Sequence, residues 1–275
     1  MTRKLLLLPL LLTMACTSTE KTEPLGEEWE PYNLVVRHQD HIRFSFPASG
    51  FAFEQKDQFV QDVYAALESN AKILGIPEYN EYFKVFFHSS RSEVEKFTGM
   101  AAAGIANVWT RELHMAAYTD EESDSTDFVL NPPIIHEMMH LMSCTTWGYP
   151  HQNLQWLNEG LATYAADNCN GYTIAEIYRY MLDEGHAYSA ADFDRHFYEL
   201  EEMIGYHQSA YYVECLIEIH GMEKFQEFWQ SNHANFEEVY GMSFEAFIEA
   251  ANERVMRIVP EKPNIDWNEF IKGCF

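Results

Sequence analysis

The stretch HEMMH at residues 136–140 decides how the rest of the chain is interpreted. On an α-helix, residues four positions apart lie on one face about one turn apart, so the rings of His136 and His140 can converge on a single ion. Glu137 lies about 100° around the helix from His136, where its carboxylate can reach a water at that ion without being a ligand. The spacing therefore predicts a helix that supplies two ligands and one base to a metal.

The third ligand is expected in the segment WLNEGLATY at residues 156–164. A catalytic zinc ion takes three protein ligands and keeps one position open, and two histidines with one carboxylate are a known set. Glu159, at the start of the next helical segment, can supply that carboxylate. We therefore predict one Zn²⁺ bound by His136, His140 and Glu159.

Apolar residues surround the motif and indicate a buried helix. They are Ile134, Ile135, Met138, Met139, Leu141 and Met142. Two histidines and a glutamate inside such a helix need partners, and a metal provides them. The second ring nitrogen of a ligand histidine usually donates to a nearby acceptor, for which Asn158 and Asp167 are the candidates.

The two segments together resemble the gluzincin clan of metallopeptidases. Eighteen residues separate His140 from Glu159, and residues 156–164 match the Trp-Leu-x-Glu-Gly-(Phe/Leu)-Ala segment of aminopeptidase N-like and peptidase MA-like domains. The metzincin arrangement would need a histidine six positions after His140, where Thr146 stands. The resemblance implies a zinc-dependent hydrolase of peptide bonds with Glu137 as general base.

Residues 205–212, GYHQSAYY, resemble a second segment of the same family. Aminopeptidase N-like enzymes carry a Tyr-x-x-Gly-Ala stretch whose tyrosine hydroxyl stabilises the oxyanion of the reaction. Tyr206 aligns with that tyrosine, and Ser209 replaces the glycine. His207 is the alternative, because thermolysin-like enzymes use a histidine in this role. The resemblance leaves both candidates open.

One family segment is missing from this sequence. Aminopeptidase N-like enzymes hold the substrate's free amino group with the glutamate of a Gly-x-Met-Glu-Asn segment, whereas residues 104–107 read GIAN. Exopeptidase specificity is therefore not implied, and an endopeptidase or a restricted oligopeptidase fits equally well. Residues 105–118 are the candidate edge of a sheet along which a substrate peptide could add as a strand.

The beginning of the chain has the pattern of a bacterial lipoprotein signal. Arg3 and Lys4 precede an apolar run that ends in Thr13-Met14-Ala15-Cys16. We expect a signal peptide at residues 1–15, a lipidated Cys16 that binds the membrane, and a location in the bacterial cell envelope. The alternative is a secretory signal cleaved near Ala15. Residues 16–33 are acidic and interrupted by prolines, and they predict a tether.

Composition excludes some partners and leaves others open. The 275 residues carry a formal net charge of −25, which disfavours nucleic acid as a partner. After Cys16, the remaining cysteines are Cys144, Cys169, Cys215 and Cys274. An even number permits two disulfides in an oxidising compartment. A bridge between Cys144 and Cys169 is one hypothesis, and unpaired buried thiols are the other.

Hydrophobic periodicity predicts an α+β fold in two lobes. Strands are expected in 34–46, 82–87, 104–109 and 112–118, and helices in 57–74, 92–97, 174–182, 206–220, 223–229 and 243–258. These elements give a mixed N-terminal lobe at 34–130 and a mainly helical lobe at 131–275. With the resemblance, they predict a thermolysin-like gluzincin domain with zinc in the cleft between the lobes.

The sequence thus predicts a lipid-anchored zinc metallopeptidase that acts on peptides or proteins. Two rival functions remain. The first is a zinc-retaining but inactive gluzincin domain that serves as a binding or scaffold module, although the intact Glu137 speaks against it. The second is a hydrolase of a non-peptide amide, which the same chemistry permits.

Overall fold

The computed structural model describes residues 34–122, 128–195 and 197–274. The predicted signal peptide, the lipidated Cys16 and the predicted tether at 16–33 lie outside the described residues. No described helix combines the length and the apolar character that crossing a membrane requires.

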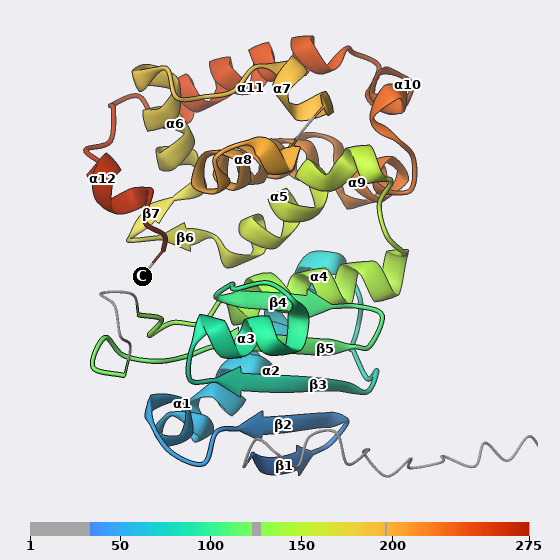
Figure 1. Ribbon diagram of the computed structural model, residues 1–275. Coiled ribbons are helices and arrows are strands. Elements are labelled where there is room, and N and C mark those ends of the chain that lie inside the picture. The colour runs from blue at the N-terminus through green and yellow to red at the C-terminus, as the bar shows by residue number, and fades with distance from the viewer. Residues whose placement is uncertain (1–33, 123–127, 196, 275) are drawn as a thin grey trace, which may run out of the picture. The chain divides into compact units, whose positions relative to one another are not determined.

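Five strands form one mixed sheet in the order β1-β2-β3-β5-β4 (Figure 1). They are β1 (Val35–Gln39), β2 (Ile42–Phe46), β3 (Phe83–His88), β4 (Gly104–Asn107) and β5 (Glu112–Ala116). The β1–β2 and β4–β5 pairs are antiparallel, while β3 pairs in parallel with both β2 and β5. Strand β4 is therefore an edge of the sheet and overlaps the predicted edge segment 105–118, whereas β5, in the same segment, is an interior strand.

Parallel neighbours require crossover connections, and helices supply them. Helices α1 (Phe51–Glu54) and α2 (Lys56–Leu74) join β2 to β3, and α3 (Arg91–Thr98) follows β3. Helix α2 buries the apolar side predicted from its sequence, and its Phe59 stacks on Phe87 of β3 with ring centroids 4.8 Å apart. Helix α3 covers the opposite face, where Val94 packs against Ala116. Figure 1 shows α2 and α3 on the two faces of the sheet.

Helices dominate the second half of the chain (Figure 1). The longer ones are α4 (Ile134–Trp147), α5 (Gln155–Ala166), α6 (Ile174–Glu184), α8 (Glu202–His220), α9 (Met222–Trp229) and α11 (Phe244–Ile258). Short elements connect them: β6 (Asn168–Cys169), β7 (Tyr172–Thr173), α7 (Ala190–Arg195), α10 (Phe236–Tyr240) and α12 (Trp267–Phe270), with 3₁₀ turns at Gln152–Leu154, Phe197–Glu199 and His233–Asn235. The α+β class predicted from the sequence is confirmed.

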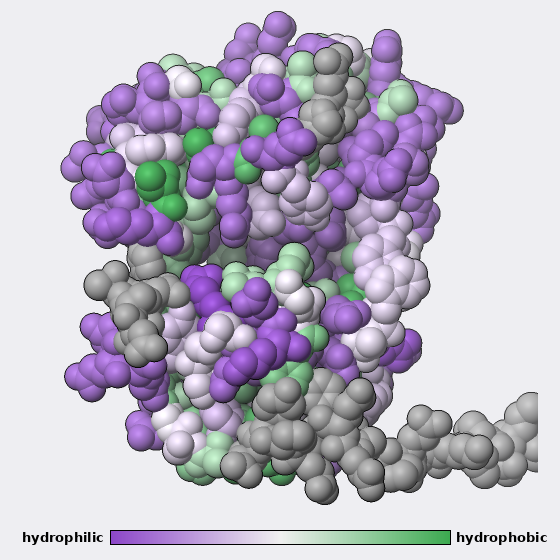
Figure 2. Space-filling view, viewed as in Figure 1, coloured by the Kyte–Doolittle hydropathy of each residue, from purple (hydrophilic) through white to green (hydrophobic). Residues whose placement is uncertain are grey.

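Helix α4 connects the sheet to the helical part, because it packs against α2 and β4 on one side and against α5 on the other. The lobe boundary predicted at residue 130 placed α4 with the helices alone. Figure 2 shows a mainly hydrophilic surface with a hollow between the sheet side and the helices. The apolar residues visible there are scattered, which agrees with the acidic composition.

Candidate metal centre

The predicted motif helix exists, and α4 holds it in a buried position. It begins directly after Pro133, where a proline is tolerated because the N–H it lacks would have no partner in the first turn. Asn70 of α2 donates from Nδ2 to the carbonyl oxygen of Ile135 at 3.0 Å. This bond ties the first turn of α4, next to His136, to α2.

Three ligand atoms meet at one point between α4 and α5. His140 Nε2 lies 3.1 Å from His136 Nε2 and 3.1 Å from Glu159 Oε2. His136 Nε2 lies 3.3 Å from the same carboxylate oxygen. The three residues predicted as ligands are thus brought together, two from α4 and one from α5.

This triangle has the dimensions of a zinc site. Zinc–nitrogen and zinc–oxygen bonds of about 2.0–2.2 Å at tetrahedral angles separate neighbouring ligand atoms by roughly 3.3–3.5 Å. The distances of 3.1 to 3.3 Å among the three atoms come close to that range. Two imidazoles and one carboxylate also match the ligand types of catalytic zinc sites, which leave a fourth position open.

Hydrogen bonds at the outer ring nitrogens set the orientation of both imidazoles. His140 Nδ1 lies 3.1 Å from Asn158 Oδ1, which confirms one of the two acceptors predicted. An amide oxygen only accepts, so Nδ1 carries the proton and Nε2 offers its lone pair to the centre. Thr163 Oγ1 lies 3.5 Å from His136 Nδ1. The other predicted acceptor, Asp167, instead ends α5 with a left-handed φ of 58°.

The Glu159 carboxylate at this triangle needs a balancing positive charge, either a proton on an imidazole or a metal ion. Burial opposes charge on both His140 and Glu159. The Glu159 carboxylate, together with Glu137 and the hydrogen bond to Asn158, nevertheless outweighs burial and raises the pKa of His140 above its usual range. In the same way, His140 and His136 outweigh burial and lower the pKa of Glu159. Two lone pairs and an anion therefore attract a positive charge, and a divalent ion at this position would satisfy all three.

Glu137 lies beside this triangle and is almost fully buried, with 7% of its surface exposed. Burial raises the pKa of its carboxyl, while His136, His140 and a hydrogen bond from the Ala106 backbone act in the opposite direction. Ala106 belongs to β4, so the edge strand borders the site. A Cβ at Gly104 would come within 2.7 Å of the Glu137 side chain. The first residue of β4 must therefore be small for Glu137 to fit.

Tyr206 and His207 differ in what they face. The Tyr206 ring lies parallel to the His136 imidazole, with centroids 6.0 Å apart and an angle of 8° between the planes. His207 lies on another side of α8, where its Nδ1 donates to the Met203 carbonyl oxygen at 2.8 Å and its Nε2 faces Cys274 Sγ at 3.7 Å. Of the two predicted oxyanion donors, Tyr206 is thus the one beside the ligands, and His207 points to the disulfide.

The sequence did not reveal Tyr198 as a site residue. Its hydroxyl donates to Glu159 Oε1 at 3.1 Å, while Oε2 of the same carboxylate faces the two imidazoles. Burial raises the pKa of the Tyr198 phenol, and the Glu159 carboxylate raises it further. Tyr198 therefore stays protonated and holds Glu159 in a one-oxygen orientation towards the centre.

The close contact between α5 and α8 places Glu159 against the rest of the site. A Cβ at Gly160 would lie 2.8 Å from the backbone carbonyl carbon and oxygen of Ser209. Gly160, which follows the candidate ligand Glu159, and the small Ser209 opposite it let the two helices approach this closely. Tyr206, one turn before Ser209 on α8, is thereby held near the ligands.

The disulfide hypothesis for Cys144 and Cys169 is wrong. Cys169 is bonded to Cys274, which lies 105 positions further along the chain. Cys144 and Cys215 are free and buried, as the alternative hypothesis held for unpaired thiols. Cys144 cannot meet Cys169 because it lies inside the α4–α5 interface, where its Sγ faces Asn158 Oδ1 at 3.8 Å.

Comparison with models of known protein families gives no match to this chain, and neither does comparison with curated proteins.

Proposed function

We propose that this protein is a zinc-dependent metallopeptidase with a gluzincin-type catalytic domain. One observation carries the proposal: His136, His140 and Glu159 offer three ligand atoms within 3.3 Å of one another, with the Glu137 carboxylate alongside. The three metal ligands by themselves would also fit a metal site with a purely structural role. A buried glutamate next to them that is not a ligand is the residue that hydrolysis requires.

Each residue then has a chemical role. When bound, zinc would supply a Lewis acid that polarises the scissile carbonyl and lowers the pKa of a water at the ion to about 7. Glu137 accepts the proton of the attacking water and later delivers a proton to the leaving amine. Burial raises the pKa of its carboxyl above the ordinary value, which makes the carboxylate a stronger base towards the attacking water.

Tyr206 is the proposed donor to the oxyanion. Burial raises the pKa of its phenol, and Glu159, Glu202 and Glu137 raise it further, so the hydroxyl keeps its proton. A protonated phenol held beside the ligand His136 can donate as negative charge develops on the carbonyl oxygen. Tyr198 holds Glu159 and is therefore proposed as a positioning residue.

Strand β4 is the proposed binding edge for an extended peptide. It is the last strand of the sheet, and its Ala106 backbone already contacts the general base. A substrate strand added to this edge would bring its backbone to the metal centre by main-chain hydrogen bonds. This arrangement favours an endopeptidase or oligopeptidase, because the described residues of β4 contain no glutamate for a free amino group.

The test combines metal analysis with cleavage of a peptide library. The wild-type chain, Glu137→Gln and Glu249→Gln are purified in parallel; Glu249 is an exposed glutamate of α11 and serves as the matched control. We expect one zinc per chain in all three proteins. Cleavage should stop when a chelator is added and return with Zn²⁺, and Glu137→Gln should lose at least about a hundredfold of the rate.

Other outcomes select the rival functions. Zinc binding without cleavage in any protein would favour an inactive domain that binds a partner. Cleavage of non-peptide amides alone, identified by mass spectrometry of the products, would favour the second rival. Failure to bind zinc in the presence of a folded chain would refute the proposal itself.

We also propose that the protein is anchored in the bacterial cell envelope through lipidated Cys16. The support is the leader pattern at residues 1–16. Mass spectrometry of the membrane fraction should find an acylated Cys16 as the first residue. In a Cys16→Ser variant the membrane-bound fraction should fall sharply. An unmodified N-terminus in soluble extracts would instead favour the secretory signal.

A further inference from the structure

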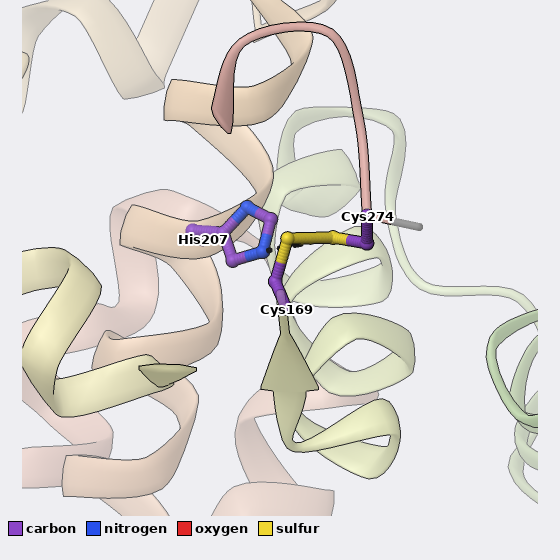
Figure 3. A group of neighbouring side chains, drawn as sticks. All are labelled: Cys169, His207 and Cys274. Atoms are coloured by element: carbon purple, nitrogen blue, oxygen red, sulfur yellow. Dashed lines mark hydrogen bonds between the residues drawn. A yellow bond between two sulfur atoms is a disulfide. The ribbon is translucent and has the colours of Figure 1, made fainter. Parts of the chain in front are cut away.

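A second group of metal-binding side chains lies outside the site described above. Cys169, His207 and Cys274 place a sulfur, an imidazole nitrogen and another sulfur within 4.8 Å of one another. They come from β6, α8 and the chain after α12, so no sequence motif joins them. Figure 3 shows the His207 ring directed at the disulfide that links the two cysteines.

The imidazole of His207 is held in the state that binds metals. Its Nδ1 lies 2.8 Å from the Met203 carbonyl oxygen, which can only accept, so Nδ1 carries the proton. Its Nε2 then offers a lone pair, and the atom it faces is Cys274 Sγ at 3.7 Å. A disulfide sulfur has no hydrogen to donate. With 4% of His207 exposed, this lone pair is buried, and among the described residues it meets no donor in the oxidised form.

Reduction would turn both neighbours into ligands. We propose that, in the reduced chain, Cys169, Cys274 and His207 form a second metal site of Cys₂His type that binds a thiophilic divalent cation such as Zn²⁺. The reductant is a dithiol, which gives two electrons and two protons to the disulfide and becomes a disulfide itself. The ion then replaces one proton on each thiol, so binding releases two protons to solvent.

The local structure allows this change. Zinc–sulfur bonds of about 2.3 Å at tetrahedral angles need the two sulfurs roughly 3.7 Å apart, so they must separate when the bond opens. Cys169 is buried in β6, with 1% exposed, whereas Cys274 is exposed and lies in the non-helical chain after α12. The exposed segment that carries Cys274 can therefore move outwards while Cys169 and His207 stay in place. Two thiolates and one imidazole are soft donors that prefer Zn²⁺ to Mg²⁺ or Ca²⁺.

Cobalt substitution tests the site, because thiolate ligands give intense near-ultraviolet charge-transfer bands with Co²⁺ and a His₂Glu site does not. All proteins carry Cys16→Ser to remove that thiol. The chain is reduced with dithiothreitol, desalted without oxygen and titrated with Co²⁺. We expect the thiolate band only after reduction, together with one additional metal per chain.

Variants show which residues give rise to the thiolate–Co²⁺ band. A Cys169→Ser/Cys274→Ser double variant should lack it, and His207→Gln should bind Co²⁺ more weakly. Cys144→Ser is the matched control and should keep it, although this buried thiol lies near the other site. A reduced chain without the band, or a band that persists in the double variant, would overturn the proposal.

A second measurement tests the site without substitutions, in case the variants fold poorly. In the reduced chain with all native ligands, Zn²⁺ should protect Cys274 from alkylation by iodoacetamide, and removal of Zn²⁺ should restore alkylation. Equal alkylation with and without Zn²⁺ would count against the site. The outcome is independent of the proposed peptidase, because loss of the His136–His140–Glu159 site lowers the metal count of both redox forms equally.

Discussion

The outer ring nitrogen of His140, Nδ1, lies 3.1 Å from the acceptor Asn158 Oδ1, which helps to orient the imidazole. We expect Asn158→Leu to weaken zinc binding by about 10- to 100-fold, because the imidazole loses the bond that fixes its tautomer and direction. Competition with a chelator of known affinity measures the change. Thr163→Val is the comparison, and its 3.5 Å contact with His136 predicts a smaller effect. Equal effects of both substitutions would contradict the assignment.

Two tyrosines near the centre should have separable roles. Tyr206→Phe should lower kcat by about 10²–10³-fold with little change in KM, because an oxyanion donor acts mainly in the transition state. Tyr198→Phe should mainly weaken zinc binding, since its hydroxyl contacts Glu159 Oε1. Steady-state kinetics and metal titration on both variants separate these effects. A fall in kcat for Tyr198→Phe alone would reverse the two roles.

At this scale the sequence predicted the residues that meet at the candidate metal centre. His136 and His140 follow from helical periodicity, and Asn158 from its place beside Glu159. Tyr198 could not be predicted, because 39 positions and two other helices separate it from the carboxylate it contacts. Thr163 could have been predicted, because it lies four positions after Glu159 and therefore on the same face of α5.

Helix packing is the element-scale feature on which the site depends. Gly160→Ala would place a Cβ 2.8 Å from backbone atoms of Ser209, which cannot move without shifting α8. We expect a loss of about 1–3 kcal/mol in the free energy of unfolding and a weaker zinc site. Gly205→Ala is the matched control on α8, because its nearest contact would be an ordinary 3.4 Å. Thermal unfolding and metal content measure both; an unchanged Gly160→Ala protein would show that the helices can separate freely.

The elements themselves were largely predictable. Helix α2 and the strands β3 and β5 follow the apolar periodicity of their sequences within a few residues. The position of α4 was not predictable in the same way. Its sequence is apolar on most sides, so periodicity could not tell that one side packs on α2 and β4 while another packs on α5.

The stability of the whole molecule should fall in mild acid. His88 is buried with 2% exposed, and burial together with the neighbouring His114 lowers its pKa from 6.5 to about 3. Between pH 6.5 and about pH 3, His88 is protonated in the unfolded chain but not in the folded chain. The free energy of unfolding therefore decreases as the pH falls below 6.5. The slope contributed by His88 is about 1.4 kcal/mol per pH unit.

Replacing His88 should reduce that slope. The free energy of unfolding of His88→Gln, measured with denaturant between about pH 4 and pH 6, should change with pH less steeply than that of the wild type. His38→Gln, at an exposed position on β1, is the control and should keep the wild-type slope. Parallel curves for all three proteins would mean that His88 is protonated in the fold.

At the scale of the whole molecule, contacts between segments far apart in the sequence could not be predicted. The Cys169–Cys274 bond spans 105 positions and depends on how the chain after α12 returns to β6. Four cysteines allow several pairings, and spacing alone does not choose among them. The acidic composition, in contrast, agrees with the mainly hydrophilic face that Figure 2 shows.

The central claim is that α4 and α5 together bind one zinc ion. Anomalous diffraction at the zinc absorption edge, from crystals of the protein grown with Zn²⁺, tests it most directly. We predict a peak about 2.0–2.2 Å from each of His136 Nε2, His140 Nε2 and Glu159 Oε2. Well-ordered side chains at these positions without a peak between them would contradict the account.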